Sequence, residues 1–467
     1  MTRCQSIDIM SSTDAPAEGL YRMHLFPYLP RRILTAAALA LPFVRASGQQ
    51  IDTSRALSTL REARAACEMD AGSLWGRSLC GPIALVDRQT RLVIANDTVA
   101  GKHFLRLGDA YVTTLPENQY VANTSFPWGG RTWTMVALPL PKDRYARVTL
   151  VMHEVFHREQ EALGLRQPDA LNNQLDMRPG RTWLRLEYRA LARALEALPD
   201  HKAARHHAES ALLFRAQRRS LYPSSDSLEA TLEIQEGLPE YTGQRLAMQL
   251  TGEGPARVAK YVREYETTPT FVRAFAYGTG PALGVLLDQF APNWRDAVRT
   301  NRDIGALLAK SIDFKLPRNL AAVSRTRAQE YGWDEVDRTE TTRDLARGPE
   351  MERYRARLGD GPVVTLRQTK DSVAWSYDPT ELIGFDLQST VYPAGNFSAP
   401  WGKLTVDHGG VLVQNDFSRI RVGAPPAPVA GNASEIKGDG WTLMLDPGWS
   451  LRADPSRPGS FVAVKDR

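Results

Sequence analysis

Apolar residues follow different spacings along this chain, and the changes in spacing divide it into stretches. From Ile83 to Leu140 they come in short runs rich in β-branched and aromatic residues, separated by Gly, Asp, Asn and Pro. Such runs are typical of β-strands. The runs are IALVD, RLVIAN, AYVTTLP and TWTMVALPL. We therefore expect residues 49–147 to be β-rich.

Residues 148–358 show helical spacing instead. In WLRLEYRALARALEAL, four leucines fall on roughly one face of a helix that is stopped by Pro199: Leu184, Leu186, Leu191 and Leu195. A second helical segment begins at His201 and ends before Pro223. We expect helices over 182–198 and 201–221, within a mostly helical domain.

Strand-like runs return beyond Gly361, in SVAWSY, LIGFDL, VLVQ, RIRV, WTLML and FVAV. A chain of 467 residues also exceeds the roughly 250–300 residues at which single cores stop growing. The pattern predicts an α+β fold. A β-rich segment (49–147) leads into a helical domain (148–358), and a separate β-rich domain follows (359–467).

The first 48 residues resemble an export signal. Arg31 and Arg32 precede an apolar run of twelve residues, Ile33–Val44, and small residues follow up to Gly48. This order is the signature of a cleaved signal peptide. Twelve helical residues are too few to cross about 30 Å of hydrocarbon. We expect a periplasmic or secreted protein without a stable membrane span after signal removal; the alternative is a buried core helix.

Composition and charge argue against nucleic acid as a partner and exclude no other class of protein. The formal charge is +5, and no basic stripe with interleaved aromatic residues occurs. Two cysteines follow the signal, Cys67 and Cys80, with twelve residues between them. In an oxidising compartment this pair can form a disulfide; two separate buried thiols are the alternative.

The candidate chemistry begins with HEVFH, which spans His153 to His157. Residues i and i+4 of a helix project from the same face, so both imidazoles can bind one Zn²⁺. Glu154 points away from that pair and can take a proton from a zinc-activated water. The surrounding apolar residues indicate a buried helix, where unpaired polar groups are costly.

A catalytic zinc needs a third protein ligand. EIQEGLPEYTG offers Glu236 and Glu240, which lie one turn apart on one helix face, so spacing leaves both open. This segment resembles the E-G-[FL]-[AT]-x-[YW] stretch of gluzincin zinc peptidases, in particular the aminopeptidase-N-like and glycyl-aminopeptidase-like families. That resemblance implies that Glu236 is the third zinc ligand.

A second segment, FAYGTGPALGVLLD, resembles the stretch that follows the ligand helix in the same families. It implies that Tyr277 stabilises the oxyanion of a tetrahedral intermediate, a role that suits a phenol donor. Gly278 and Gly280 allow close approach of backbone or substrate. The resemblance covers residues 150–290.

The chain departs from these families in two ways. His157 and Glu236 are separated by 78 residues, a far longer interval, which the two predicted extra helices occupy. The G-x-M-E-N segment is also missing, and Trp128–Met135, in a similar place, contains no carboxylate to bind a free α-amine. Cleavage inside a chain and removal of N-terminal residues therefore both stay open.

Three further polar residues lie in the extra helices. We expect His206 and His207 to face solvent, and Glu187 is a candidate hydrogen-bond partner for a zinc histidine.

The sequence predicts an exported zinc peptidase that acts on a peptide or protein. Two alternatives are a non-catalytic binding protein on a peptidase-like scaffold and a zinc amidase acting on another cell-envelope amide.

Overall fold

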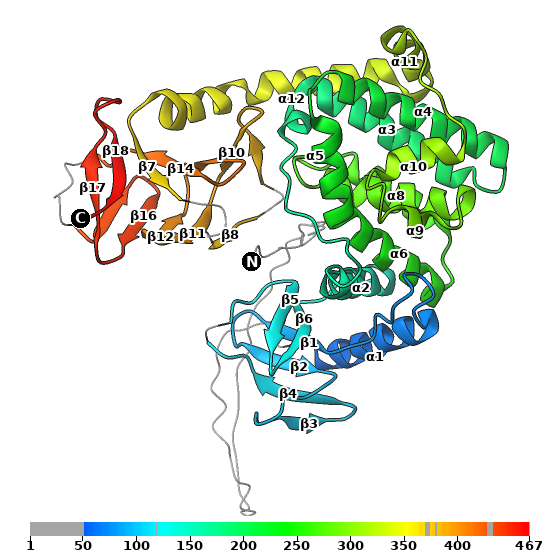
Figure 1. The fold of residues 1–467 in the computed structure, drawn as a ribbon, viewed down its shortest axis with the longest axis horizontal. Coiled ribbons are helices and arrows are strands. Elements are labelled where there is room, and N and C mark those ends of the chain that lie inside the picture. The colour runs from blue at the N-terminus through cyan, green and yellow to red at the C-terminus, as the bar shows by residue number, and fades with distance from the viewer. Residues whose placement is uncertain (1–50, 118, 369–373, 379–380, 427–432, 467) are drawn as a thin grey trace, which may run out of the picture.

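The computed structural model describes residues 51–117, 119–368, 374–378, 381–426 and 433–466 (Figure 1). The predicted signal peptide lies outside these residues. In the part of the chain that is described, no helix combines the length and apolar character needed to span a bilayer.

The chain enters through helix α1 (Thr53–Asp70), which Asp52 caps by accepting a hydrogen bond from the Arg55 N–H. A six-stranded sheet follows, in the order β3-β4-β2-β1-β6-β5. Its strands are β1 (Ile83–Asp87), β2 (Leu92–Ala95), β3 (Leu105–Leu107), β4 (Ala110–Thr114), β5 (Thr124–Trp128) and β6 (Arg131–Leu138). The β1–β6 pair is parallel, and the other pairs are antiparallel.

Both faces of this sheet are buried. Ile83 and Leu85 point into a large core shared with the helices, whereas Ala84 and Val86 point into a separate core on the other face. Successive side chains of β1 point to opposite faces of the sheet and therefore pack into two different cores. Helix α2 (Arg144–Glu159) packs beside β5 and β6, at the edge formed by β5.

The helical region begins with η1 (Asn173–Asp176) and surrounds a π-helical turn, η2 (Glu233–Gly237). Its helices are α3 (Arg178–Glu196), α4 (His201–Ser220), α5 (Ser225–Leu232), α6 (Leu238–Thr251), α7 (Pro255–Tyr265), α8 (Phe275–Phe290), α9 (Trp294–Ala297), α10 (Ile304–Ser311) and α11 (Leu320–Ala328), then η3 (Gln329–Tyr331). The long α12 (Trp333–Tyr354) and η4 (Arg355–Asp360) then lead across to the C-terminal strands (Figure 1).

Two sheets make up the C-terminal region. Their orders are β17-β18-β7-β14-β13-β10-β9 and β15-β16-β12-β11-β8. The strands are β7 (Val363–Arg367), β8 (Ala374–Ser376), β9 (Ile383–Gly384), β10 (Ser389–Tyr392), β11 (Gly395–Ala399), β12 (Gly402–Val406), β13 (Val411–Gln414), β14 (Arg419–Gly423), β15 (Glu435–Gly438), β16 (Trp441–Leu445), β17 (Trp449–Ala453) and β18 (Phe461–Lys465). Their shared core also takes in Leu171 and Val272 from two loops of the helical region.

The predicted α+β fold, with a helical region followed by C-terminal β sheets, is confirmed. The two extra helices are α3 and α4. In the N-terminal sheet, β3 and β5 were not predicted, because β3 is a short, mostly exposed strand and β5 contains Pro127. Six C-terminal strands also lie outside the predicted runs: β7, β10, β11, β12, β15 and β17. Proline is tolerated at β5 because that strand lies at the sheet edge.

Candidate metal centre

Helix α2 brings the two histidines of HEVFH together. His153 and His157 are 2% and 6% exposed, and their Nε2 atoms lie 3.0 Å apart. Helix α6 crosses α2 closely because Gly243 has no side chain, and a Cβ there would meet the Thr149 carbonyl at 2.4 Å. This crossing brings the segment with Glu236 and Glu240 beside the histidines.

Glu236 completes a group that could bind a metal ion. It lies in η2 and is fully buried, and its Oε2 is 3.6 Å from the Nε2 atoms of both His153 and His157. These three residues offer ligand atoms that all lie within 4.8 Å of one another. The π-helical turn suits such a site, because π-bulges occur frequently at functional positions.

The hydrogen bonds of the two imidazoles fix which ring nitrogen of each faces the site. His153 Nδ1 lies 2.9 Å from Glu240 Oε2, a carboxylate oxygen that only accepts. His157 Nδ1 lies 2.9 Å from Gln160 Oε1. The Gln160 amide nitrogen donates to three backbone carbonyls, which fixes its oxygen towards His157.

Both Nδ1 atoms must therefore carry the proton. The two Nε2 atoms are therefore the ring nitrogens that face the site, 3.0 Å from each other and each 3.6 Å from Glu236 Oε2. Two imidazole nitrogens and a carboxylate oxygen in this arrangement form the donor set of a metal such as zinc, so the residues fit the ion.

The electrostatics of the site point the same way. Burial opposes the charged form of His153, but its contacts with Glu236 and Glu240 and the charge of Glu154 outweigh burial and raise its pKa to about 10. Burial likewise opposes the charge of Glu236, yet the Arg273 guanidinium and both histidines hold its pKa well below the ordinary value. The site therefore favours positive charge on His153 beside an ionised Glu236.

The two predicted catalytic residues also lie at this group. Glu154 is 1% exposed and acts electrostatically on His153. The Tyr277 ring stacks parallel to His153 at 5.6 Å, and its hydroxyl donates to Glu236 Oε2 at 2.6 Å. Helix α8 comes this close because Gly280 lies directly against Gly237, where a Cβ would meet backbone at 2.3 Å. The close approach expected at Gly280 is thus present.

The structure separates the roles of the two candidate third ligands. Glu240 contacts Nδ1 of His153, on the opposite side of the ring from the other ligand atoms, and also accepts from the Gln244 amide at 3.1 Å. It orients His153 and fixes its tautomer.

The sequence analysis missed two residues of the site. Gln160 orients His157 through a contact with its Nδ1. Arg273 donates a hydrogen bond to Glu236. Arg273 precedes Tyr277 by four residues inside an apolar segment. A single charged residue in such a segment indicates a buried ion pair, so Arg273 could have been recognised from the sequence.

The prediction for Glu187 was wrong. Its carboxylate is buried but accepts hydrogen bonds from Arg215 and Arg218 rather than from a histidine. His206 and His207 lie on α4 beside Glu330, with side chains 44% and 19% exposed. His206 thus faces solvent as expected, whereas His207 is partly covered and contacts the Tyr331 hydroxyl at 2.6 Å.

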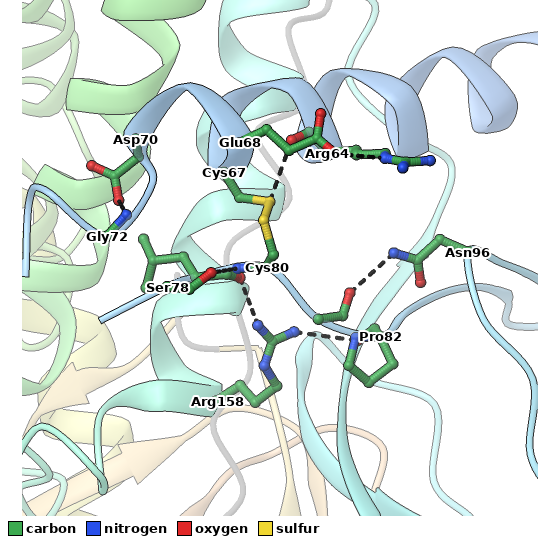
Figure 2. The surroundings of a disulfide bond; sticks show 12 residues. Arg64, Cys67, Glu68, Asp70, Gly72, Ser78, Cys80, Pro82, Asn96 and Arg158 are labelled. Carbon is green, nitrogen blue, oxygen red and sulfur yellow. Dashed lines mark hydrogen bonds and ion pairs between the residues drawn. A yellow bond between two sulfur atoms is a disulfide. The ribbon is translucent and has the colours of Figure 1, made fainter. Parts of the chain in front are cut away.

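A disulfide joins Cys67 on α1 to Cys80, which confirms the expected pairing (Figure 2). The segment around Cys80 holds the end of α2, because Arg158 donates to the carbonyls of Leu79 and Pro82 at 2.6 and 3.3 Å. Trp75, inside the loop that the disulfide closes, packs against Phe156 with the ring centroids 5.1 Å apart and the rings tilted by 52°. The disulfide loop therefore braces the helix that carries both histidines.

Comparisons with protein-family models, curated proteins and solved structures found no match to this chain. The resemblance to gluzincins over residues 150–290 stays a prediction.

Proposed function

We propose that this chain is an exported zinc-dependent peptidase whose metal is held by His153, His157 and Glu236. The observation that carries the proposal is the convergence of three buried ligand atoms: the two histidine Nε2 atoms lie 3.0 Å apart, and Glu236 Oε2 lies 3.6 Å from each. Two histidines and one glutamate are a donor set of catalytic zinc sites, which keep a further position for water or substrate.

When bound, zinc would supply Lewis acidity, drawing electron density from a water molecule and from the substrate carbonyl. Glu154 accepts the proton of the attacking water and passes it to the leaving amine as the C–N bond breaks. The Tyr277 hydroxyl donates to the carbonyl oxygen as negative charge develops there. The same hydroxyl donates to Glu236 Oε2 at 2.6 Å, so it lies beside the oxygen that would bind the metal.

The proposed substrate is an extended peptide. Strand β5 is an edge strand and packs beside α2 (Figure 1). An exposed edge can bind an extended chain through main-chain hydrogen bonds, with little demand on sequence. Peptides with free and with acetylated N-termini would separate removal of terminal residues from internal cleavage.

Glu154→Gln provides the test. The variant should retain one zinc per chain while hydrolysis of a mixed peptide library falls by at least about 10²-fold, because only the proton acceptor is lost. Zinc content and cleavage are measured on the same preparations. Zinc-loaded wild-type protein that cleaves no peptide would reject the peptidase proposal, and turnover of other amides would then favour the amidase alternative.

A further inference from the structure

Arg273 is a buried arginine that contacts the carboxylate of the candidate metal ligand. It lies in the turn before α8, and its side chain is 2% exposed. Its Nη2 is 2.8 Å from Oε1 of Glu236, and its Nη1 is 2.7 Å from Oδ1 of Asp169. A planar guanidinium whose two Nη atoms each contact a carboxylate has little freedom to rotate.

The two oxygens of Glu236 consequently have different neighbours. Oε1 faces Arg273, whereas Oε2 is the oxygen 3.6 Å from both histidine Nε2 atoms. A carboxylate can bind a metal through one oxygen or through both, and a second bound oxygen takes up coordination space that a catalytic site leaves for water.

We propose that Arg273 is a positioning residue that makes Glu236 a one-oxygen ligand, and that the C-terminal β region holds this arginine in place. The proposal rests on the metal site of the proposed function.

The C-terminal sheets contact both the loop that carries Arg273 and the loop that carries Asp169. Val272, next to Arg273, and Leu171, near Asp169, belong to the same core as Tyr392 of β10. The amide of Asn173, the first residue of η1, lies four residues after Asp169 and donates to the backbone carbonyls of residues 386 and 389, each at 2.8 Å. The loops that carry Arg273 and Asp169 are thus packed against the C-terminal sheets.

The test compares Arg273→Met and Arg273→Lys in the full chain, with Arg181→Met as the matched control. Arg181 is an equally buried arginine, 4% exposed in its side chain, and it donates to Glu340 at 2.8 Å. Glu340 is not among the candidate metal ligands. Arg181 also packs on Phe271 and donates to the Pro269 carbonyl, in the loop that leads to Arg273. The control therefore reports the cost of losing a buried guanidinium that supports the same loop but leaves the contact between Arg273 and Glu236 in place.

Visible absorption of the cobalt-substituted proteins reports the coordination number directly. Arg273→Met should weaken and shift the cobalt bands, because Glu236 can then bind through both oxygens. Zinc should remain bound, and kcat should fall by about 10- to 100-fold with little change in KM. Arg273→Lys should restore part of the wild-type spectrum, and Arg181→Met should keep all of it.

An unchanged cobalt spectrum in Arg273→Met would overturn the proposal. If that variant does not fold, Arg273→Lys and Asp169→Asn decide, and wild-type spectra in both would overturn it equally. A wild-type protein that binds neither cobalt nor zinc would reject the proposed function itself, before any variant is compared.

Discussion

Two groups of buried charged side chains meet at the π-helical turn η2. Glu233 points into the first, which we call the arginine cluster: Glu187, Arg215, Arg218, Glu229 and Glu233. Glu236, three residues later, points into the second, the metal cluster: His153, Glu154, His157, Glu236 and Glu240. Both groups are shielded from solvent, so their differences cannot come from exposure.

Within the arginine cluster, each charged side chain forms ion pairs with other members of the cluster. Arg218 donates two hydrogen bonds of 2.9 Å to Glu229, and Arg215 donates to Glu187 and to Glu233. Glu229 and Glu233 each face one guanidinium in fork geometry, and Glu187 bridges Arg215 and Arg218. Such a network needs no further ion, and its role is to hold α3, α4 and η2 together.

The metal cluster is composed differently. Three carboxylates surround two imidazoles, and Arg273 offsets one of the charges. Its two Nε2 atoms and Glu236 Oε2 lie within 4.8 Å of one another, an arrangement that could bind a metal ion. The arginine cluster has no such convergence, because each of its carboxylates is bound by guanidinium groups. The comparison teaches that the type and arrangement of the donor atoms, rather than burial, distinguish the two groups.

The largest expected effect follows from removing a metal ligand. In wild-type protein, excess zinc should raise the melting temperature, because a ligand that binds only the folded state stabilises it. In His157→Ala this rise should disappear, since one of three ligands is lost. Thermal unfolding with and without zinc measures the effect.

His206→Ala is the matched control for that measurement. It removes a histidine from α4, in the partly exposed group with Glu330, and should keep the zinc-dependent rise. A rise that persists in His157→Ala and vanishes in His206→Ala would move the metal site to the other histidine group.

The arginine cluster should respond in stability rather than in metal binding. Arg218→Met leaves Glu187 and Glu229 buried without this partner and should lower the free energy of unfolding by about 3–5 kcal/mol. Arg64→Met, which breaks a surface pair whose arginine is 74% exposed, should change it by at most about 1 kcal/mol. Urea unfolding measures both, and equal losses would contradict the distinction.

The pH dependence of stability sharpens the same contrast. Burial opposes the charge of Glu229, but Arg218 and Arg219 outweigh it and lower its pKa from 4.5 to about 2. The folded-state pKa lies below the unfolded one, so this contribution is complete above about pH 4.5 and is lost as the pH falls towards 2. Arg218→Met should therefore lose less stability than wild type over that acid range.

The sequence predicted the parts of the fold and site that depend on local spacing. Helix α2 and its histidine pair follow from an i,i+4 pattern within apolar residues, and α3 and α4 follow from leucine spacing and the flanking prolines. Strand β5 has a weak local signal, because its proline is tolerated only at a sheet edge that the sequence does not reveal.

Pairings between distant segments could not be predicted in this way. Glu187 was recognisable as a polar residue on an apolar helix face, but its partners come from α4. Spacing alone left Glu236 and Glu240 equivalent, since both face the same side of a regular helix. The π-helical turn and the crossing at Gly243 give them different neighbours, and both features depend on tertiary packing.

The smallest expected effect concerns Glu240, which lies between the two kinds of group. It contacts His153 Nδ1 at 2.9 Å and accepts from Gln244, so it supports a ligand and is itself hydrogen-bonded. Glu240→Gln keeps an oxygen that can accept the His153 proton but removes the charge. Zinc affinity should fall by about 10- to 100-fold, the usual cost of losing such a partner. Glu236→Gln should weaken binding further, because a carboxylate ligand is lost. Competition with a chromophoric chelator at matched pH measures both constants. If Glu240→Gln loses more zinc affinity than Glu236→Gln, Glu240 is the ligand. Glu236 would then be a structural ion-pair partner of Arg273, like the carboxylates of the arginine cluster.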